Sequence, residues 1–203
     1  MVFDILNKIL EKESDSYIST NLNISIGTVK RWIELKSVPK SYTFDLMKLA
    51  NMDIDYSKFS YQEKDQFFTP EKTSKYCYSK LIEIINNNGD NETDYTYIEP
   101  SAGNGSFLKV LPDNTIALDI EPRNDKVQKQ DYLDWEPEIK DKYVVIGNPP
   151  FGLRGQLALK FINHSSKFAD YVCFILPQLF NSNGKGSCKS RVKKLNLIHI
   201  GLQ

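Results

Sequence analysis

The chain has 203 residues and as many acidic as basic side chains, which is enough for one ordinary domain and a smaller one. A formal net charge of zero excludes a globally basic nucleic-acid-binding protein, so any such contact would come from a local patch. The chain has no apolar run long enough for a membrane span and no signal-peptide pattern, and its three cysteines are widely spaced. We therefore expect a cytoplasmic protein with reduced thiols and no metal site.

The first 58 residues are predicted to form short helices without strands. Two of these helices, within residues 17–34, would share a small apolar core, which consists of Leu22, Ile24, Val29, Trp32 and Ile33. Ser25 stands at the predicted turn, where its hydroxyl can cap the second helix. The pattern resembles the helix-turn-helix of phage repressors, which implies contacts to double-stranded DNA from Ser25, Thr28, Lys30 and Arg31. A small helical bundle that serves packing or protein contact is the alternative interpretation.

Beyond residue 61, apolar strand-like runs alternate with helical stretches. The predicted strands are residues 95–98, 115–120, 143–146, 171–176 and 197–200. Strands that alternate with helices favour a parallel, doubly wound sheet. The sequence therefore predicts a small all-α domain over residues 1–58 and an α/β domain with a mostly parallel sheet over residues 61–203.

A glycine loop, residues 99–105, follows the first predicted strand and precedes a helical run. Gly103 and Gly105 have no Cβ, so the backbone can turn tightly there and approach a ligand closely. The loop lacks the ending of a P-loop and the third glycine of the dinucleotide fingerprint, and by itself it is equally consistent with a tight turn. Asp119, at the tip of the next strand, is placed to bind the two hydroxyls of a ribose. Together these features favour an adenosine-type cofactor without a pyrophosphate.

Asn148, Pro149, Pro150 and Phe151 follow the buried strand of residues 143–146. Neither proline can donate a backbone hydrogen bond, so the strand must end there in a rigid turn. Ligands of open α/β sheets bind at the carboxyl ends of the strands, where this turn would present an amide, a carbonyl and an aromatic ring. That combination suits a planar group with an amino substituent, such as a nucleobase. The alternative is a plain strand end in which Phe151 packs into the core.

Five motifs lie within residues 67–177, namely residues 67–70, 99–105, 119–120, 130–133 and 148–151. Together they resemble the motifs of the adenine-N6 DNA methyltransferases that use S-adenosylmethionine (AdoMet). The resemblance implies a Rossmann-like class I methyltransferase sheet and a cofactor site formed by Phe68, Thr69, Pro70, Glu99, Pro100, Ser101, Ala102, Gly103, Gly105, Asp119, Ile120, Asp131 and Tyr132. It implies that Ile120 lies against the cofactor's adenine and that Asp131 accepts from its amino group. The alternative interpretation of Asp131 is a solvated acidic residue of a loop. Thr69 and Pro70 are also predicted to begin a helix, as its cap and its first residue.

The same resemblance implies that residues 148–151 are catalytic. An exocyclic amine is a poor nucleophile because its lone pair is delocalised into the ring. The Asn148 side-chain oxygen and the Pro149 carbonyl can accept the two amino hydrogens, which favours a pyramidal nitrogen, and Pro150 fixes the direction of that carbonyl. Phe151 offers a face for stacking an adenine flipped out of the duplex. The expected reaction is direct methyl transfer from AdoMet to N6, without a covalent enzyme intermediate.

Three other functions are consistent with these motifs: methylation of adenine in RNA, methylation of glutamine N5 in a protein, and AdoMet or DNA binding without catalysis. The resemblance implies a seven-stranded sheet and a later aromatic motif, so we expect the chain to be a fragment rather than a reduced enzyme. A restriction endonuclease or the missing C-terminal region is the expected protein partner, in a restriction–modification system or a virus.

One further stretch of the sequence is basic. It contains Lys185, Lys189, Arg191, Lys193 and Lys194 and no acidic residue. Such a stretch either follows the DNA backbone near the catalytic face or is a solvated loop.

Overall fold

The structure is a computed structural model in which residues 2–22, 24–55, 58–59, 68–138, 141–182, 187–197 and 201 are described, with Leu153 described by its backbone alone. The chain forms two compact units, residues 1–66 and 67–203. Asn23, Phe67, Lys185 and most of the predicted strand at residues 197–200 lie outside the described residues. Over the described ranges, no helix combines the length and the apolar character needed to cross a bilayer.

The unit of residues 1–66 is helical. Its helices are α1 (Val2–Leu10), α2 (Asp15–Leu22), α3 (Ile26–Glu34) and α4 (Thr43–Leu49), with a 3₁₀ turn at Lys40–Tyr42 before α4. One residue from each helix is fully buried, namely Leu6, Ile18, Val29 and Leu46. Ser25 caps α3, because its Oγ accepts a hydrogen bond from the Thr28 backbone N–H at 3.1 Å. The two predicted helices and the predicted cap are confirmed.

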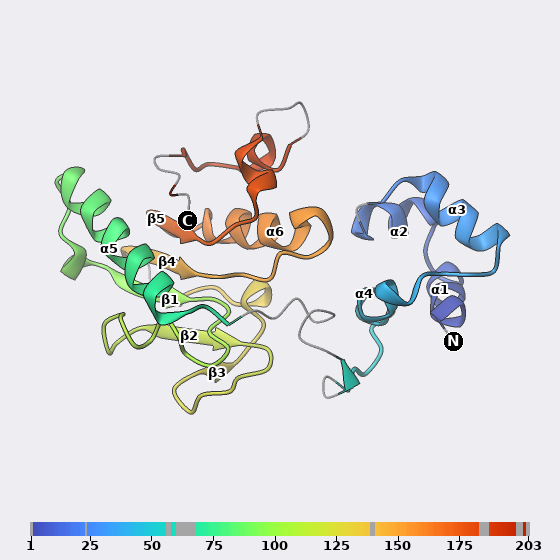
Figure 1. The fold of residues 1–203 in the computed structure, drawn as a ribbon, viewed down its shortest axis with the longest axis horizontal. Helices are drawn as coiled ribbons and strands as arrows, with labels where there is room; N and C mark the ends of the chain where they lie inside the picture. Colours follow the sequence, from blue (N-terminus) through green and yellow to red (C-terminus); the bar gives the residue numbers. More distant parts are fainter. Residues whose placement is uncertain are drawn as a thin grey trace. The chain divides into compact units, whose positions relative to one another are not determined.

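The unit of residues 67–203 is an α/β structure around a five-stranded sheet (Figure 1). Its main elements are α5 (Glu71–Asn87), β1 (Thr96–Glu99), β2 (Ile116–Asp119), β3 (Gln128–Lys129), β4 (Tyr143–Gly147), α6 (Gln156–Ser165) and β5 (Tyr171–Phe174). The strand order is β3-β2-β1-β4-β5 and every pairing is parallel, which is a Rossmann-like arrangement. The prediction of a parallel α/β sheet is confirmed. β3 was not predicted, because both of its residues are polar and exposed.

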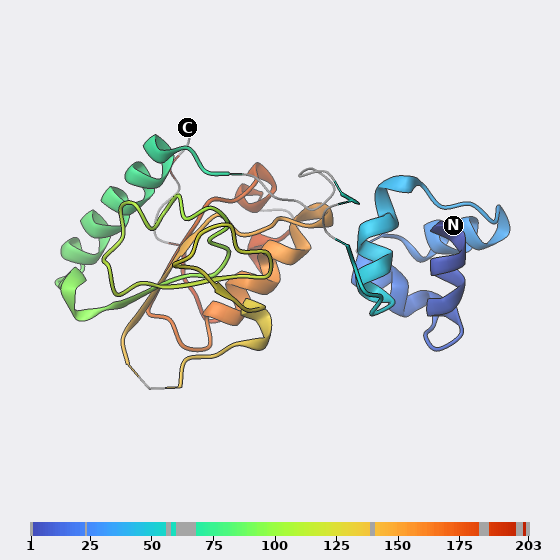
Figure 2. The ribbon, with the colours of Figure 1, turned by 90° about the horizontal axis from the view of Figure 1, so that it is seen from below.

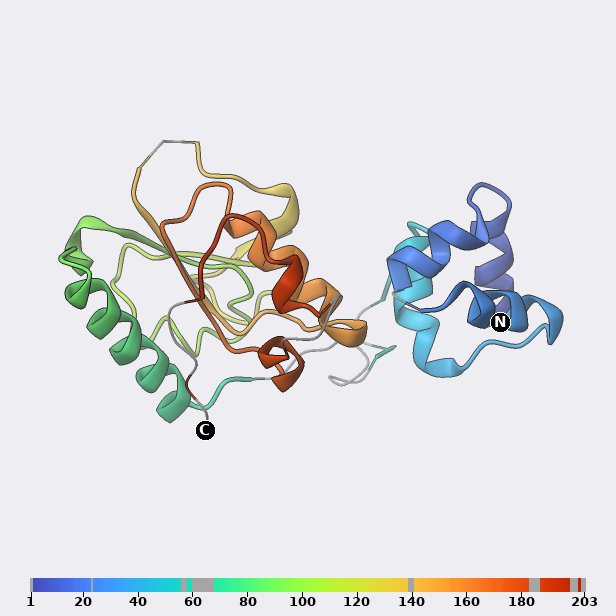
Figure 3. The same cartoon turned by 90° about the horizontal axis from the view of Figure 1, so that it is seen from above.

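Different helices cover the two faces of the sheet, as Figures 2 and 3 show. On one face, Leu81 of α5 belongs to a core cluster with Val144 and Ile146 of β4. On the other face, Phe161 of α6 belongs to a cluster with Val145 of the same strand. Successive side chains of a strand point to opposite faces, so a fully apolar strand such as β4 serves both layers. The sheet is thereby fixed between α5 and α6, with its strand ends available for a site.

Two local predictions around the glycine loop are wrong. Residues 106–111 form consecutive turns rather than a helix, because the following Pro112 disfavours helical backbone at Leu111 and leaves too short a run. At the start of α5, the cap is Pro70 rather than Thr69. The Pro70 carbonyl accepts from the Thr73 and Ser74 backbone N–H groups at 2.9 and 3.1 Å, so the helix begins one residue later than predicted.

Candidate active site at the carboxyl edge of the sheet

The loops that carry the predicted site residues meet at one edge of the sheet. Because every strand pairing is parallel, β1, β2, β3 and β4 all end at that edge (Figure 1). There the glycine loop leaves β1, residues 119–124 leave β2, residues 130–132 leave β3, and residues 148–151, the Asn-Pro-Pro-Phe loop, leave β4. The topology thus brings together segments that are far apart in the sequence.

Asp119, the last residue of β2, holds the glycine loop closed. Its Oδ2 accepts from the Gly103 backbone N–H at 2.8 Å, and its Oδ1 accepts from the Glu121 backbone N–H at 2.7 Å. The Ala102 N–H adds a hydrogen bond to the Leu118 carbonyl at 2.9 Å. A carboxylate oxygen can accept more than one hydrogen bond, so Asp119 retains lone pairs for two hydroxyl donors. Beside the predicted ribose contact, the carboxylate therefore has a structural role that sequence reasoning missed.

An aromatic ring lies beside the glycine loop. A Cβ built on Gly103, whose φ is +52°, would lie 3.9 Å from both Asp119 Oδ2 and Phe68 Cε1, so the carboxylate and the ring flank the same point of the backbone. The Arg123 guanidinium lies 5.4 Å from the centre of the Phe68 ring and 3.3 Å from Glu121 Oε1. Arg123 was not predicted, because no spacing rule places it on a ring so much earlier in the chain.

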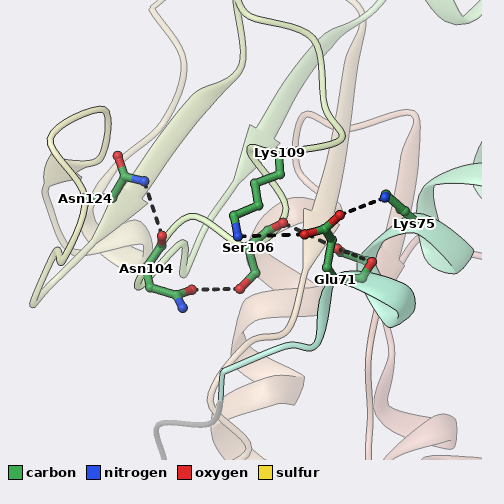
Figure 4. A network of polar contacts seen from close by, with 7 residues as sticks. Glu71, Lys75, Asn104, Ser106, Lys109 and Asn124 are labelled. Carbon is green, nitrogen blue, oxygen red and sulfur yellow. Dashed lines mark hydrogen bonds and ion pairs between the residues drawn. The ribbon is translucent and has the colours of Figure 1, made fainter.

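Hydrogen bonds join the start of α5 to Ser106, which directly follows the glycine loop (Figure 4). The single hydroxyl hydrogen of the fully buried Ser74 is shared between the Glu71 carbonyl at 3.0 Å and the Ser106 carbonyl at 3.3 Å. Ser106 Oγ donates to Asn104 Oδ1 at 2.7 Å, and Asn124 Nδ2 donates to the Asn104 carbonyl at 3.2 Å. The first turn of α5 is therefore joined to Ser106, and the glycine loop is joined to the loop after β2.

Exposed ion pairs surround Glu71 at the start of α5 (Figure 4). Glu71 contacts Lys75 at 2.7 Å and Lys109 at 3.9 Å, and the hydrogen bond and charge of Lys75 lower the pKa of the Glu71 carboxyl, with a further contribution from Lys109. Exposed pairs of this kind contribute little to stability because solvent screens them. The buried Ser74 is therefore the main connection between α5 and the glycine loop.

Gly105→Ala is expected to destabilise the α/β unit more than its matched control, Gly89→Ala. Both glycines have left-handed backbone, with φ of +78° and +82°, which costs other residues about 1–2 kcal/mol. A Cβ on Gly89 would meet nothing within 4 Å, whereas one on Gly105 would lie 2.5 Å from Asn124 Nδ2 and disrupt its hydrogen bond to Asn104. We expect the loss of unfolding free energy to be about 1 kcal/mol larger for Gly105→Ala. Urea unfolding measures both values, and equal losses would contradict the proposed packing.

Glu99, the last residue of β1, places a buried carboxyl group beside Asp119. Its side chain is 2% exposed, and within the described part of the chain its Oε2 has no hydrogen-bond partner. Burial, together with the charge of Asp119, raises the pKa of Glu99 to about 8, although a hydrogen bond from the Phe107 backbone opposes the rise. At neutral pH this carboxyl is therefore mainly protonated. A cationic ligand group beside it would favour the ionised form.

The raised pKa of Glu99 predicts a pH-dependent stability that Glu99→Gln removes. Between the ordinary pKa of 4.5 and about 8, the folded chain keeps a proton on Glu99 that the unfolded chain releases. The stabilising contribution of this proton is complete below pH 4.5, is lost as the pH rises through this window, and is level above it. Urea unfolding of both forms is measured from pH 5 to pH 9. The unfolding free energy of Glu99→Gln should rise relative to that of the unaltered chain up to about pH 8. Glu138→Gln is the control, because Glu138 is exposed. If the difference in unfolding free energy between Glu99→Gln and the unaltered chain does not change with pH, the raised pKa of Glu99 is contradicted.

The Asn-Pro-Pro-Phe loop is joined to the glycine loop by a hydrogen bond. The Ser101 hydroxyl donates to the Asn148 backbone carbonyl at 3.1 Å. Asn148 and Pro150 are half-buried and Pro149 is buried. The two predicted motifs are therefore neighbours in space.

Phe151 is half-buried and packs in the apolar cluster that α6 forms with residues after β5. Its carbonyl accepts from the Leu157 and Ala158 backbone N–H groups at 3.1 and 3.2 Å, which fixes the turn into α6. Gly152 is required next to it, because a Cβ there would lie 2.7 Å from Leu157 Cβ. The packing that was considered as an alternative is present, and it leaves Phe151 partly exposed.

The predicted adenine-binding residues differ in their surroundings. Asp131 is exposed and caps a short 3₁₀ turn, with its Oδ1 accepting from the Leu133 backbone N–H at 2.9 Å. Tyr132 is 1% exposed, and its hydroxyl is hydrogen-bonded to Ser165 Oγ at 2.7 Å. Burial raises the pKa of Tyr132. Its side chain belongs to the core, so only the backbone of Tyr132 could contact a cofactor. That contact stays a prediction. Ile120 is half-buried directly after Asp119.

The four predicted DNA-binding residues form a separate group on α3, in the unit of residues 1–66. Lys30 and Arg31 are exposed. The hydroxyls of Ser25 and Thr28 are hydrogen-bonded to each other at 2.8 Å, so both also stabilise the start of the helix. Ile26 is 42% exposed beside them and was not among the predicted residues.

Comparison with known proteins identifies no relative of the chain. No family model matches it, no curated protein matches it, and no solved structure matches it. The case for a function therefore depends on the site residues and their geometry.

Proposed function

We propose that the chain is an AdoMet-dependent DNA methyltransferase that acts on the N6 amino group of adenine. The observation that carries the proposal is the hydrogen bond from Ser101 to Asn148, which joins a loop suited to an adenosine cofactor to a loop suited to an amino-bearing base. Direct transfer requires the methyl donor and the acceptor to be held side by side. The adjacency of the two loops is what such a reaction needs.

The residues at this edge fit AdoMet by their chemistry. Asp119 retains acceptor capacity for the two ribose hydroxyls although it already accepts two backbone hydrogen bonds. Glu99 offers a buried oxygen without a partner in the described chain, which suits the ammonium group of the methionine part. Gly103, with Phe68 beside it, leaves the backbone open to close approach. When bound, AdoMet supplies a methyl group on a positively charged sulfur.

Asn148 and Pro149 would hold the amine that is methylated. The Asn148 side-chain oxygen accepts one N6 hydrogen and the Pro149 carbonyl accepts the other, which draws the nitrogen lone pair out of conjugation. Pro150 keeps that carbonyl in a fixed direction. The exposed part of Phe151 stacks on the adenine, which must be flipped out of the duplex to reach the loop.

The helical unit would add a DNA contact. α2 and α3 have the order and the capped turn of a helix-turn-helix, and α3 exposes Lys30 and Arg31. These side chains suit phosphates and guanine edges. A helix-turn-helix of this kind would bring double-stranded DNA to the enzyme.

A transfer assay with tritiated AdoMet tests the proposal. The full chain is incubated with unmethylated duplex DNA, with RNA and with protein in separate reactions. We expect label in DNA, recovered as N6-methyladenine after digestion to nucleosides. Label in RNA alone or in protein glutamine would reject the DNA assignment. AdoMet binding without transfer to any of the three would favour a non-catalytic protein.

A further inference from the structure

The zero net charge of the chain conceals a strong separation of charge along the sequence. From Lys142 to Gln203, lysine and arginine occur nine times, whereas Asp170 is the one acidic residue. Asp170 precedes β5 and accepts from the Tyr143 backbone N–H at 3.2 Å, at the amino ends of β4 and β5. The stretches that follow β4 and β5, at the carboxyl edge, therefore contain no acidic residue. This concentration of positive charge occurs in the part of the chain that carries the Asn-Pro-Pro-Phe loop.

Hydrogen bonds fix residues 191–194, called the basic segment, onto α6. Arg191 Nη1 donates to Gln156 Oε1 at 3.0 Å, and Asn163 Nδ2 donates to the Arg191 carbonyl at 3.2 Å. Asn163 Oδ1 accepts from the Lys193 backbone N–H at 2.8 Å. Arg191 thus positions the segment through its own guanidinium. Residues 191–193 are consequently an ordered part of the surface of α6 rather than a solvated loop.

Four exposed basic residues, from α6, from the turn before it and from the segment fixed onto it, are called the basic face: Arg154, Lys160, Lys193 and Lys194. Lys160 stands four residues after Gln156 and three before Asn163, so it lies on the face of α6 that holds the basic segment. Arg154 belongs to the turn before α6, and its carbonyl accepts from the Cys188 thiol at 3.5 Å.

Packing connects the basic face with the Asn-Pro-Pro-Phe loop. Val192 and Leu195 pack in the same apolar cluster as Phe151. Lys193 and Lys194, which stand between them, are exposed. The residue proposed to stack on the target base and the exposed lysines therefore share one apolar support.

We propose that the basic face binds the phosphate backbone of the duplex that flanks the flipped adenine. The inference rests on the proposed function and assigns it a second DNA contact, in the same unit as the Asn-Pro-Pro-Phe loop. Lysine and arginine side chains neutralise phosphates and release their counterions. Phosphate contacts set orientation and affinity and carry no sequence information, so this face would serve every target sequence equally.

The triple variant Lys160→Gln/Lys193→Gln/Lys194→Gln in the full chain tests the inference. Its binding to an unmethylated duplex of mixed sequence is followed by fluorescence anisotropy over a series of potassium chloride concentrations. Each phosphate contact contributes about 0.9 to the slope of log K against log salt, so we expect a slope shallower by about 2–3. In the transfer assay, KM for DNA should rise at least about 10-fold while kcat at saturating DNA stays within about twofold.

A variant with the same charge change elsewhere on the unit is the matched control. Lys80→Gln/Lys142→Gln/Lys167→Gln alters α5, the start of β4 and the turn after α6, and should leave the slope unchanged. Equal slopes for the two triple variants would overturn the inference. If the unaltered chain binds DNA but transfers no methyl group, the proposed function fails, while the comparison of slopes still decides on the basic face.

Discussion

Asn148→Ala is expected to lower the rate of methyl transfer to DNA about 100- to 1,000-fold while the affinity for AdoMet stays within about twofold of the unaltered chain. The substitution removes the side-chain oxygen that would accept an N6 hydrogen and leaves the Asn148 carbonyl, which holds the Ser101 hydroxyl, in place. Loss of one preorganised hydrogen-bond partner of a reacting group costs about 100- to 1,000-fold in kcat. Initial rates with tritiated AdoMet, together with calorimetric titration of AdoMet, measure the two quantities separately.

Asn87→Ala is the matched control for this prediction. Asn87 is exposed at the end of α5, so its replacement tests the loss of an amide away from the proposed site. We expect full transfer activity from it. Full activity in Asn148→Ala would reject the mechanism, and a parallel loss of AdoMet affinity would show that Asn148 acts on the cofactor side instead.

The second large effect is expected from Asp119→Ala. Two hydrogen bonds from ribose hydroxyls to a carboxylate contribute about 1.5–3 kcal/mol each, so the Kd for AdoMet should rise at least about 100-fold. The same substitution removes the acceptors of the Gly103 and Glu121 N–H groups, which should lower the unfolding free energy by about 1–3 kcal/mol. Titration well below the midpoint of thermal unfolding keeps the two effects apart.

Asp125→Ala provides the control, because Asp125 is exposed a few residues further along the same loop. It should leave both the Kd for AdoMet and the unfolding free energy unchanged. Unchanged AdoMet affinity in Asp119→Ala would remove the ribose role of Asp119. If Asp119→Ala lowers the unfolding free energy but leaves the AdoMet affinity unchanged, the one role that remains for Asp119 is to hold the glycine loop closed.

Most strands of the sheet could be predicted because their residues are apolar on both faces. β4 is the clearest case, since all five of its residues are buried, and a run of that kind is typical of a central parallel strand. β3 escaped prediction because a two-residue exposed strand has no apolar pattern and exists only through its pairing with β2. The run after the glycine loop was predicted to be helical, but Pro112 restricts it to turns.

The candidate site was predictable as a set of chemical groups and not as a set of contacts. Asp119 was singled out for its place at a strand tip, but its hydrogen bond to Gly103 depends on how β1 and β2 pair. Arg123 could not be found from sequence, because its contact with Phe68 crosses the chain without any regular spacing. Tyr132 was taken as part of a cofactor motif, and the core between the sheet and α6 holds its side chain.

The sequence by itself determined the alternation of strands and helices, the cap of α3, and the presence of an amide, two prolines and a ring at the end of β4. These features depend on residues that are close neighbours in the chain, so hydrophobic period and backbone chemistry are sufficient to specify them. Tertiary structure alone decided the partners: Ser101 with Asn148, Ser74 with Ser106, and the basic segment with α6. Such contacts depend on which strands pair and which faces pack. The chemistry of one segment does not specify which distant segment it will contact.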